Sequence, residues 1–273
     1  MSGAVTRVAG VDLAAEAAGT ALAVLSAGGG AVALESLSLG LDDDAIVRAT
    51  REVELIGIDC AFGWPRDFVD FVSRHSNAAE RAAAVGGVQP ADPAPALEAT
   101  GDLAWRRRLA YRETDRVVTE RTGARPLSVA TDRLGMTALR CAVLLQRLAA
   151  DLASVGRHVD RSGQNGSAVV EVYPAMALRV WGLARPGYKQ SADARRALIV
   201  DLEQAAPWLE LGEHRALMTT SADALDAVLA ALVALAHRRG ASIPPESHQQ
   251  QLAEVEGWIA IPTVPLDQLG AVA

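Results

Sequence analysis

The chain has 273 residues, of which half are hydrophobic and only 4% are aromatic, and it carries a net charge of −7. Such a composition supports a sizeable core made mostly of Ala, Val and Leu, and it argues against global disorder. The negative charge argues against a protein that coats nucleic acid nonspecifically, but it leaves room for an enzyme with a local basic groove. From the length we expect one domain spanning 1–273.

No targeting or membrane-spanning segment is visible in the sequence. The first apolar run already contains Asp12, whereas a secretory signal is uncharged there, and no run of about 18 uninterrupted apolar residues occurs. Cys60 and Cys141 show neither a metal-binding spacing nor a disulfide framework. We therefore expect a soluble cytoplasmic protein without a membrane partner.

The first 65 residues predict the order strand, strand, strand, helix, strand. The strands are short apolar runs, and the second and third flank three consecutive glycines, as in an antiparallel hairpin. The helix opens with three aspartates, which suit the positive end of a helix. In chain order the segments are strands at 7–13, 21–27 and 31–39, a helix at 42–53 and a strand at 54–62.

The rest of the chain predicts mainly helices, with one further strand. A stretch rich in Gly and Pro, 86–95, predicts a loop, and a late apolar run, 258–262, indicates a short strand or a covering segment. The remaining segments are helices at 66–85, 102–122 and 132–155, a strand at 168–173, and helices at 174–183, 192–206 and 220–239.

Three of the predicted strands contain a carboxylate where a buried strand should have none. Asp12 and Asp59 stand at the carboxyl ends of their strands, and Glu171 lies between valines. A lone carboxylate in an apolar strand is costly to desolvate unless a cation compensates it. Because ligands of open α/β sheets gather at the carboxyl edge, neighbouring parallel strands would bring these acids into one crevice.

The predicted helix at 220–239 adds a fourth acidic position. Asp223 and Asp226 are three residues apart and therefore share one helix face, on which Asp226 aligns with an apolar stripe. No Lys or Arg stands at a neighbouring helical spacing to pair with it. Several carboxylates with oxygen-only ligands favour Mg²⁺ or Mn²⁺ over Zn²⁺, and two such ions about 4 Å apart support phosphodiester cleavage.

Each acid also has a structural explanation that the sequence leaves open. Asp12 and Asp59 would cap the loop or helix after their strands, and Glu171 would pair with a buried arginine. Asp223 would close a capping box with Thr220, which has the required three-residue spacing. The metal-site hypothesis therefore depends on the coincidence of all these acids and not on any one of them.

The order of these elements, with an acid on the first and fourth strands and a late D-x-x-D helix, resembles the ribonuclease H-like superfamily. The helix motif is similar to the final motif of the Holliday-junction resolvases in that superfamily. More closely, the chain resembles the "domain of unknown function 429" family, whose members are described as predicted nucleases. The shared phrases are Gly10-Val11-Asp12, Ile58-Asp59-Cys60-Ala61-Phe62-Gly63-Trp64-Pro65, Arg112-Glu113-Thr114-Asp115, Glu171-Val172-Tyr173-Pro174, Tyr188-Lys189 and Asp223-Ala-Leu-Asp226-Ala.

This resemblance implies an α/β fold of the ribonuclease H-like kind, with a mixed sheet of three antiparallel strands followed by parallel strands and flanked by helices. A mainly helical insertion at about 73–160 would carry specificity or form a lid. The implied activity is that of a metal-dependent nuclease or other phosphodiester hydrolase that uses Mg²⁺ or Mn²⁺. The implied catalytic and metal-ligating residues are Asp12, Asp59, Glu171 and Asp226, with Asp223 as a further metal ligand.

Two basic positions are candidate contacts to a nucleic-acid substrate. Arg112 would contact a phosphate, with Asp115 holding it, although an ion pair within or between helices is the alternative. Lys189, which follows a turn, would contact the scissile phosphate or is an ordinary exposed lysine. Seven arginines against three acids between residues 105 and 125 give 7 − 3 = +4, which suits a nucleic-acid partner or a solvated helix with ion pairs.

Two other classes of protein share parts of this pattern. An ATP-dependent phosphotransferase of the actin and sugar-kinase kind needs Gly-rich phosphate loops, which do not follow Asp12. A non-catalytic module that binds nucleic acid or a nucleotide would retain the fold without the metal chemistry. The sequence does not separate DNA from RNA or from a small nucleotide, and it leaves a homodimer open.

Overall fold

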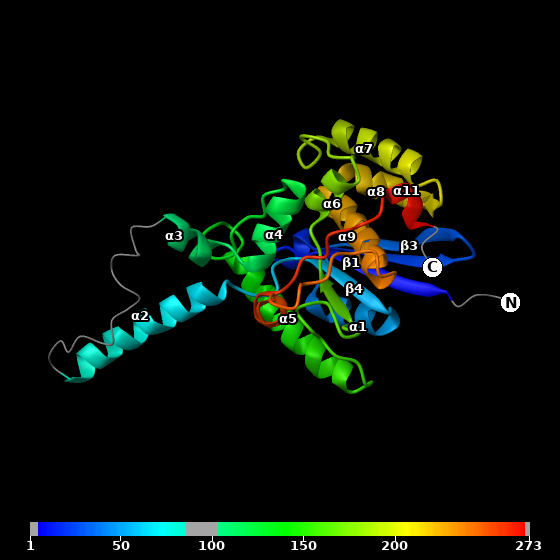
Figure 1. The fold of residues 1–273 in the computed structure, drawn as a ribbon. Coiled ribbons are helices and arrows are strands. Elements are labelled where there is room, and N and C mark those ends of the chain that lie inside the picture. The colour runs from blue at the N-terminus through cyan, green and yellow to red at the C-terminus, as the bar shows by residue number, and fades with distance from the viewer. Residues whose placement is uncertain (1–4, 86–102, 271–273) are drawn as a thin grey trace.

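A mixed β-sheet forms the centre of the protein. The structure, a computed structural model, describes residues 5–85 and 103–270, and within them the sheet has six strands in the order β5-β4-β1-β2-β3-β6 (Figure 1). The first three strands pair antiparallel, whereas β4 pairs parallel to β1, β5 parallel to β4 and β6 parallel to β3. The strands are β1 (Thr6–Asp12), β2 (Ala21–Gly28), β3 (Ala31–Leu39), β4 (Leu55–Asp59), β5 (Val169–Glu171) and β6 (Leu209–Glu210).

This arrangement confirms the expected α/β class with three antiparallel strands followed by parallel ones, and it is consistent with a ribonuclease H-like fold. Between β4 and β5 the described residues contain four helices. None of the helices described is both long enough and apolar enough to cross a membrane. The predicted loop at 86–95 lies outside the described residues.

Helices cover both faces of the sheet, and the alternation of β1 decides which side chains meet which helices. Val8 packs with the residues of α9 (Ala222–Arg238) on one face, whereas Ala9 and Val11 pack with α1 (Asp43–Glu52) and α5 (Gly135–Ala153) on the other. Because strand side chains alternate between faces, Gly10 and Asp12 belong to the α9 face. The same alternation places Leu55, Gly57 and Asp59 of β4 on that face.

Helix α9 is the innermost helix of the protein. Every residue from 224 to 236 is buried, which is typical of a helix that has protein on all sides. It packs on β1, β2, β3 and β4, and α6 (Pro174–Val180) and α8 (Arg215–Thr220) pack against it (Figure 1). The helix that was predicted at 220–239 therefore exists, and Gly240 follows its end in a left-handed conformation with φ +69°.

Two glycines that face each other across β1 and β4 let α9 lie directly on the strands. Gly10 and Gly57 are register partners. A Cβ atom on Gly10 would lie 2.1 Å from the backbone nitrogen of Ala231, and one on Gly57 would lie 2.9 Å from the backbone oxygen of Ala230. Any larger residue at Gly10 would therefore push the helix away from the sheet.

Two predicted helix boundaries are wrong. The segment 102–122 is two helices, α3 (Leu103–Ala110) and α4 (Glu113–Thr122), because Arg112 is extended and donates its backbone N–H to Asp115. Helix α9 begins after Ser221, whose hydroxyl accepts from the N–H of Ala224. Thr220 instead donates its hydroxyl to carbonyls within α8, so the capping box between Thr220 and Asp223 does not form.

The other helices surround the sheet and α9. The long α2 projects away from the sheet, with α3 near it and α4 closer to the body of the protein (Figure 1). The late apolar run at 258–262 meets the sheet edge through an isolated bridge from Ile259 to Glu171, and Pro262 forms a separate bridge with Ser242, which lies outside the sheet. The remaining elements are η1 (Ala17–Gly19), α2 (Arg66–Val85), α7 (Ala192–Ala205), η3 (Gly212–His214), α10 (Gln250–Glu256) and α11 (Leu266–Leu269).

Substitution of Gly10 by Ala tests the contact between α9 and the sheet. The added Cβ meets backbone, which cannot rotate away, so we expect a loss of about 3 kcal/mol or more in the free energy of unfolding. The matched control is Gly135→Ala, where a Cβ meets nothing within 4 Å and the change is at most slightly stabilising. Denaturant unfolding measures both, and equal stability of the two variants would contradict the close contact.

Candidate functional site

Asp12 and Asp59 stand side by side at the carboxyl ends of β1 and β4. They are register partners on adjacent parallel strands, which lie about 4.8 Å apart, and both point to the face that α9 covers. Both side chains are half-buried. Within the described part of the chain, neither carboxylate accepts a hydrogen bond or lies in an ion pair. Two neighbouring carboxylates therefore lack a compensating contact.

This arrangement makes both carboxyl groups harder to ionise. Burial first, and then the negative charges of Asp226 and Asp223, raise the pKa of Asp12 to about 8, while Lys189 opposes the shift. Burial, followed by the charges of Asp12 and Asp226, raises the pKa of Asp59 well above its ordinary value. The acids that the sequence pointed to on two strands and one helix are thus close enough to affect one another's charge.

Asp226 faces these two acids from the second turn of α9. Its side chain is only 1% exposed, and the hydroxyl of Tyr188 donates to its Oδ1 at 2.9 Å. The Nζ of Lys189 lies 2.9 Å from its Oδ2, but this oxygen accepts no well-aligned hydrogen bond, so the contact is one of charge. Burial raises the pKa of Asp226, and Lys189 and Tyr188 oppose that rise. Asp223 is half-buried in the first turn of the same helix.

Arg195 holds the segment that brings Lys189 to the site. Its buried guanidinium donates to the carbonyl oxygens of Tyr188 at 2.8 Å and Lys189 at 3.3 Å. It also donates to the carbonyls of Thr219 at 2.8 Å and Thr220 at 3.1 Å, just before α9 begins. One arginine thus ties the backbone that carries Lys189 to the start of the helix that carries Asp226.

The structure does not bring Glu171 to Asp12 and Asp59. Val170 and Val172 pack on the α9 face of the sheet, so the side chain between them points to the opposite face. Burial raises the pKa of Glu171, and the nearby guanidinium of Arg112 opposes the rise. The predicted acid is therefore a neighbour of the site in the sheet but lies on its other side.

Glu171 and Arg112 form a buried bidentate ion pair, which is the structural alternative that the sequence left open for both. The two Nη atoms of Arg112 donate to the two carboxylate oxygens at 2.7 and 2.8 Å. Arg112 also donates to Asp115 at 2.9 and 3.2 Å and to the carbonyl of Glu256 at 3.0 Å, and Phe62 donates its N–H to Glu171. Arg112 is 3% exposed, so its guanidinium has no free edge for a phosphate.

The other arginines of residues 105–125 divide between paired and exposed positions. Arg116 pairs with Glu113 at 2.6 Å, and Arg121 lies 3.5 Å from Glu246. Residues 106–108 on α3 are exposed to solvent, although Arg108 lies 3.7 Å from Asp67. Part of this segment thus forms ion pairs and part of it is a basic surface, so each of the two expectations describes only some of its arginines.

The donor set fits a hard divalent cation, although it is not a complete cage. Among the described residues, no three Asp, Glu, His or Cys side chains form a group that would hold an ion by themselves. Mg²⁺ keeps several waters and is usually bound by one or two carboxylates together with substrate phosphates. Asp12 and Asp59 supply such a pair, because their oxygens are not engaged by other described groups.

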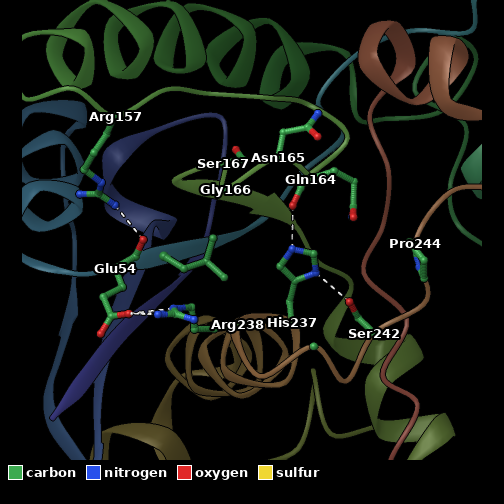
Figure 2. Close-up of a pocket in the computed structure, with 13 residues that line it drawn as sticks. Glu54, Arg157, Gln164, Asn165, Gly166, Ser167, His237, Arg238, Ser242 and Pro244 are labelled. Atoms are coloured by element: carbon green, nitrogen blue, oxygen red, sulfur yellow. Dashed lines mark hydrogen bonds and ion pairs between the residues drawn. The ribbon is translucent and has the colours of Figure 1, made fainter. Parts of the chain in front are cut away.

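A pocket of about 730 Å³ lies at the opposite end of β4 and is separate from the acidic residues. Arg238 pairs there with Glu54, and Arg157 donates to the carbonyl oxygens of Thr50 and Glu54 (Figure 2). His237 lies between the carbonyl of Gly163 and the hydroxyl of Ser242. Both ring nitrogens of His237 are engaged, each at 2.7 Å, and burial lowers the pKa of this histidine. His237 and the pair of Arg238 with Glu54 are therefore already engaged within the protein.

Sequence reasoning missed Tyr188 and Arg195 as parts of the site, and it left Asp226 without a protein partner. Lys189 supplies that partner from a segment that is distant along the chain, where helical spacing cannot reveal it. Tyr188 and Arg195 carry no signal of their own in a single sequence, because their roles depend on carbonyl and carboxylate groups that only the fold brings near.

Comparison with known proteins identifies a family but no characterised relative. The family profile described as "Protein of unknown function (DUF429)" matches residues 10–249. Neither the comparison with curated proteins nor the comparison with solved structures gives a significant match.

Asp12→Asn should change how the stability of the metal-free protein depends on pH. The folded-state pKa of Asp12 is about 8 against an ordinary 3.8, so the folded protein binds the extra proton and loses stability as pH rises through that window. In a chelator, we expect the variant to melt higher than wild type at pH 8 and to show a flatter pH profile. Glu213→Gln, at an exposed position, is the control that keeps the wild-type slope. A variant that melts lower at pH 8 would contradict this electrostatic description.

Proposed function

The chain belongs to the DUF429 family of proteins of unknown function, and we propose that it is a metal-dependent nuclease that uses Mg²⁺ or Mn²⁺ in a two-metal acidic site. The single observation that carries the proposal is the pair Asp12 and Asp59. These carboxylates lie together at the carboxyl edge of parallel strands, where α/β proteins bind ligands, and no described group forms a hydrogen bond or an ion pair with either of them. Such carboxylates are costly to keep ionised, and a bound cation would offset that cost.

The number of acids supports more than one ion. Asp12 and Asp59 would hold metal from the strands, and Asp226 with Asp223 would hold it from α9. Since one or two carboxylates suffice for one Mg²⁺, these four supply ligands for two. Divalent ions there would supply the charge that stabilises the attacking and leaving oxygens in phosphodiester cleavage. Glu171 and Arg112 are left out of this set because each already engages the other.

A nucleic-acid substrate is supported by the surroundings of the site. Helices α2 and α3 lie beyond the edge of the sheet at which β1 and β4 end (Figure 1). The exposed arginines of α3 face solvent there, and such groups contact phosphates through charge. The ammonium of Lys189, on a side chain that is 49% exposed, would contact a phosphate next to the acids.

One observation favours the alternative, a non-catalytic module that binds nucleic acid or a nucleotide. No three metal-binding side chains of the described residues form a group, so the acids as they stand hold an ion only with help from water or substrate. In this alternative the carboxylates bind no metal, and the exposed arginines alone bind the ligand.

Metal titration and cleavage assays on the same preparations separate the two functions. We expect calorimetry to detect Mn²⁺ binding by the wild type, and we expect cleavage of single-stranded or duplex nucleic acid that depends on Mg²⁺ or Mn²⁺. Asp12→Asn and Asp59→Asn should each reduce cleavage to background without loss of folding, because they remove ligands and not packing. Glu213→Gln, purified in the same way, should cleave as wild type does.

Two outcomes would contradict the nuclease. Absence of Mn²⁺ heat and of any metal-dependent rise in melting temperature would favour the binding module. Cleavage that survives both strand substitutions would show that the activity comes from another site or from a contaminant.

A further inference from the structure

The chain contains 25 arginines but a single lysine, and that lysine lies in the acidic site. Every other cationic side chain outside histidine is a guanidinium. The ammonium of Lys189 lies 2.9 Å from a buried oxygen of Asp226, and its charge also acts on Asp12 and Asp59. The residue type that is otherwise absent thus pairs with Asp226 and lies near enough to Asp12 and Asp59 for their charges to act on it.

The chemistry of lysine explains why an arginine would not serve here. An ammonium is a compact, strongly hydrated point charge on a flexible four-carbon stem, whereas a guanidinium is a planar fork that binds carboxylates in a fixed bidentate geometry. The Arg112–Glu171 pair on the other face of the sheet has that fixed geometry. At Asp226 the contact with Lys189 is a charge contact to one oxygen, without a well-aligned hydrogen bond.

Hydrogen bonds hold the backbone around Lys189, whereas half of its side chain is exposed to solvent. Arg195 ties the carbonyls of residues 188 and 189 to the start of α9, and Tyr188 bonds the other oxygen of Asp226. The Lys189 side chain itself is 49% exposed, whereas Asp226 is 1% exposed. Rotation of the lysine stem into solvent would therefore uncover one carboxylate oxygen while Tyr188 keeps the group in place.

We propose that Lys189 is an internal counter-ion of the acidic site, which occupies the cation position beside Asp226 in the metal-free protein and must be displaced before a divalent ion binds there. This inference rests on the proposed function, because it assumes that the acids bind metal. Its consequence is regulatory: the lysine keeps the empty site neutral enough to fold and sets a higher metal concentration for loading. Once displaced, the ammonium points to solvent, where a phosphate of the substrate would lie.

A calorimetric titration with Mn²⁺ of wild type, Lys189→Met and Asp12→Asn tests the displacement. Removing the competing charge should tighten Mn²⁺ binding by about tenfold, because the ammonium and the divalent ion repel each other across a few ångströms at a partly buried site. Lys189→Arg, which keeps the charge, should bind no more tightly than wild type. Asp12→Asn should lose the binding and serves as the control for the site.

A second measurement uses the single lysine of the wild-type protein. Wild-type protein labelled with ¹³C at the lysine side chains gives one Cε signal, because the chain has one lysine. Addition of diamagnetic Mg²⁺ should move this signal to the position of a solvated lysine, with the same midpoint that calorimetry gives for Mg²⁺. In Asp59→Asn the signal should stay where it is.

The outcomes distinguish the inference from the proposed function. If wild type and Lys189→Met bind Mn²⁺ equally, or if the Met variant binds more weakly, or if Mg²⁺ binds without moving the lysine signal, the counter-ion role is overturned while the metal site stands. If no variant and no wild-type sample binds either ion, the proposed function fails and the inference fails with it.

Discussion

The contact of α9 with the bare backbone of β1 and β4 is the constraint on which the site depends. Helix and strands approach closely only because Gly10 and Gly57 face each other beneath the helix, where a Cβ would meet backbone atoms. This approach brings Asp226 to the carboxyl edge of the sheet, where Asp12 and Asp59 end their strands. Residues 224–236 of the helix are buried, so Asp226 is held away from bulk water. The packing of α9 on the sheet therefore also determines the electrostatic environment of Asp226.

The acids of the sheet divide into two groups that differ in how their charge is compensated. On the side away from α9, Glu171 is compensated by Arg112 in a bidentate pair, and further donors complete the contact. On the α9 side, Asp12 and Asp59 have no such partner among the described residues, and burial raises the pKa of both. The contrast separates a carboxylate that an arginine compensates from carboxylates that the described residues leave without an ion pair.

Much of the fold and of the acidic site was predictable from the sequence, and each wrong prediction has a physical cause. Strand polarity was enough to place Asp12 beside Asp59, and three-residue spacing was enough to place Asp223 and Asp226 on one face of a helix, since both are local rules. The face to which Glu171 points was not predictable, because valines flank it and both faces of its strand are buried. The break before α4 was missed because Asp115 competes with the helix for the N–H of Arg112. Asp226 pairs with Lys189, which is distant along the chain and therefore invisible to rules of helical spacing. That Lys189 is the single lysine of the chain was the available signal for this pair.

The central claim is that Asp12 and Asp59 bind one divalent cation jointly, and anomalous diffraction from a crystal grown with Mn²⁺ tests it most directly. The account predicts an anomalous peak between the two strand ends, about 2.1 Å from a carboxylate oxygen of each residue, with the side chain of Lys189 turned away from Asp226. A well-ordered crystal with manganese bound only elsewhere, and with the two carboxylates solvated separately, would contradict it.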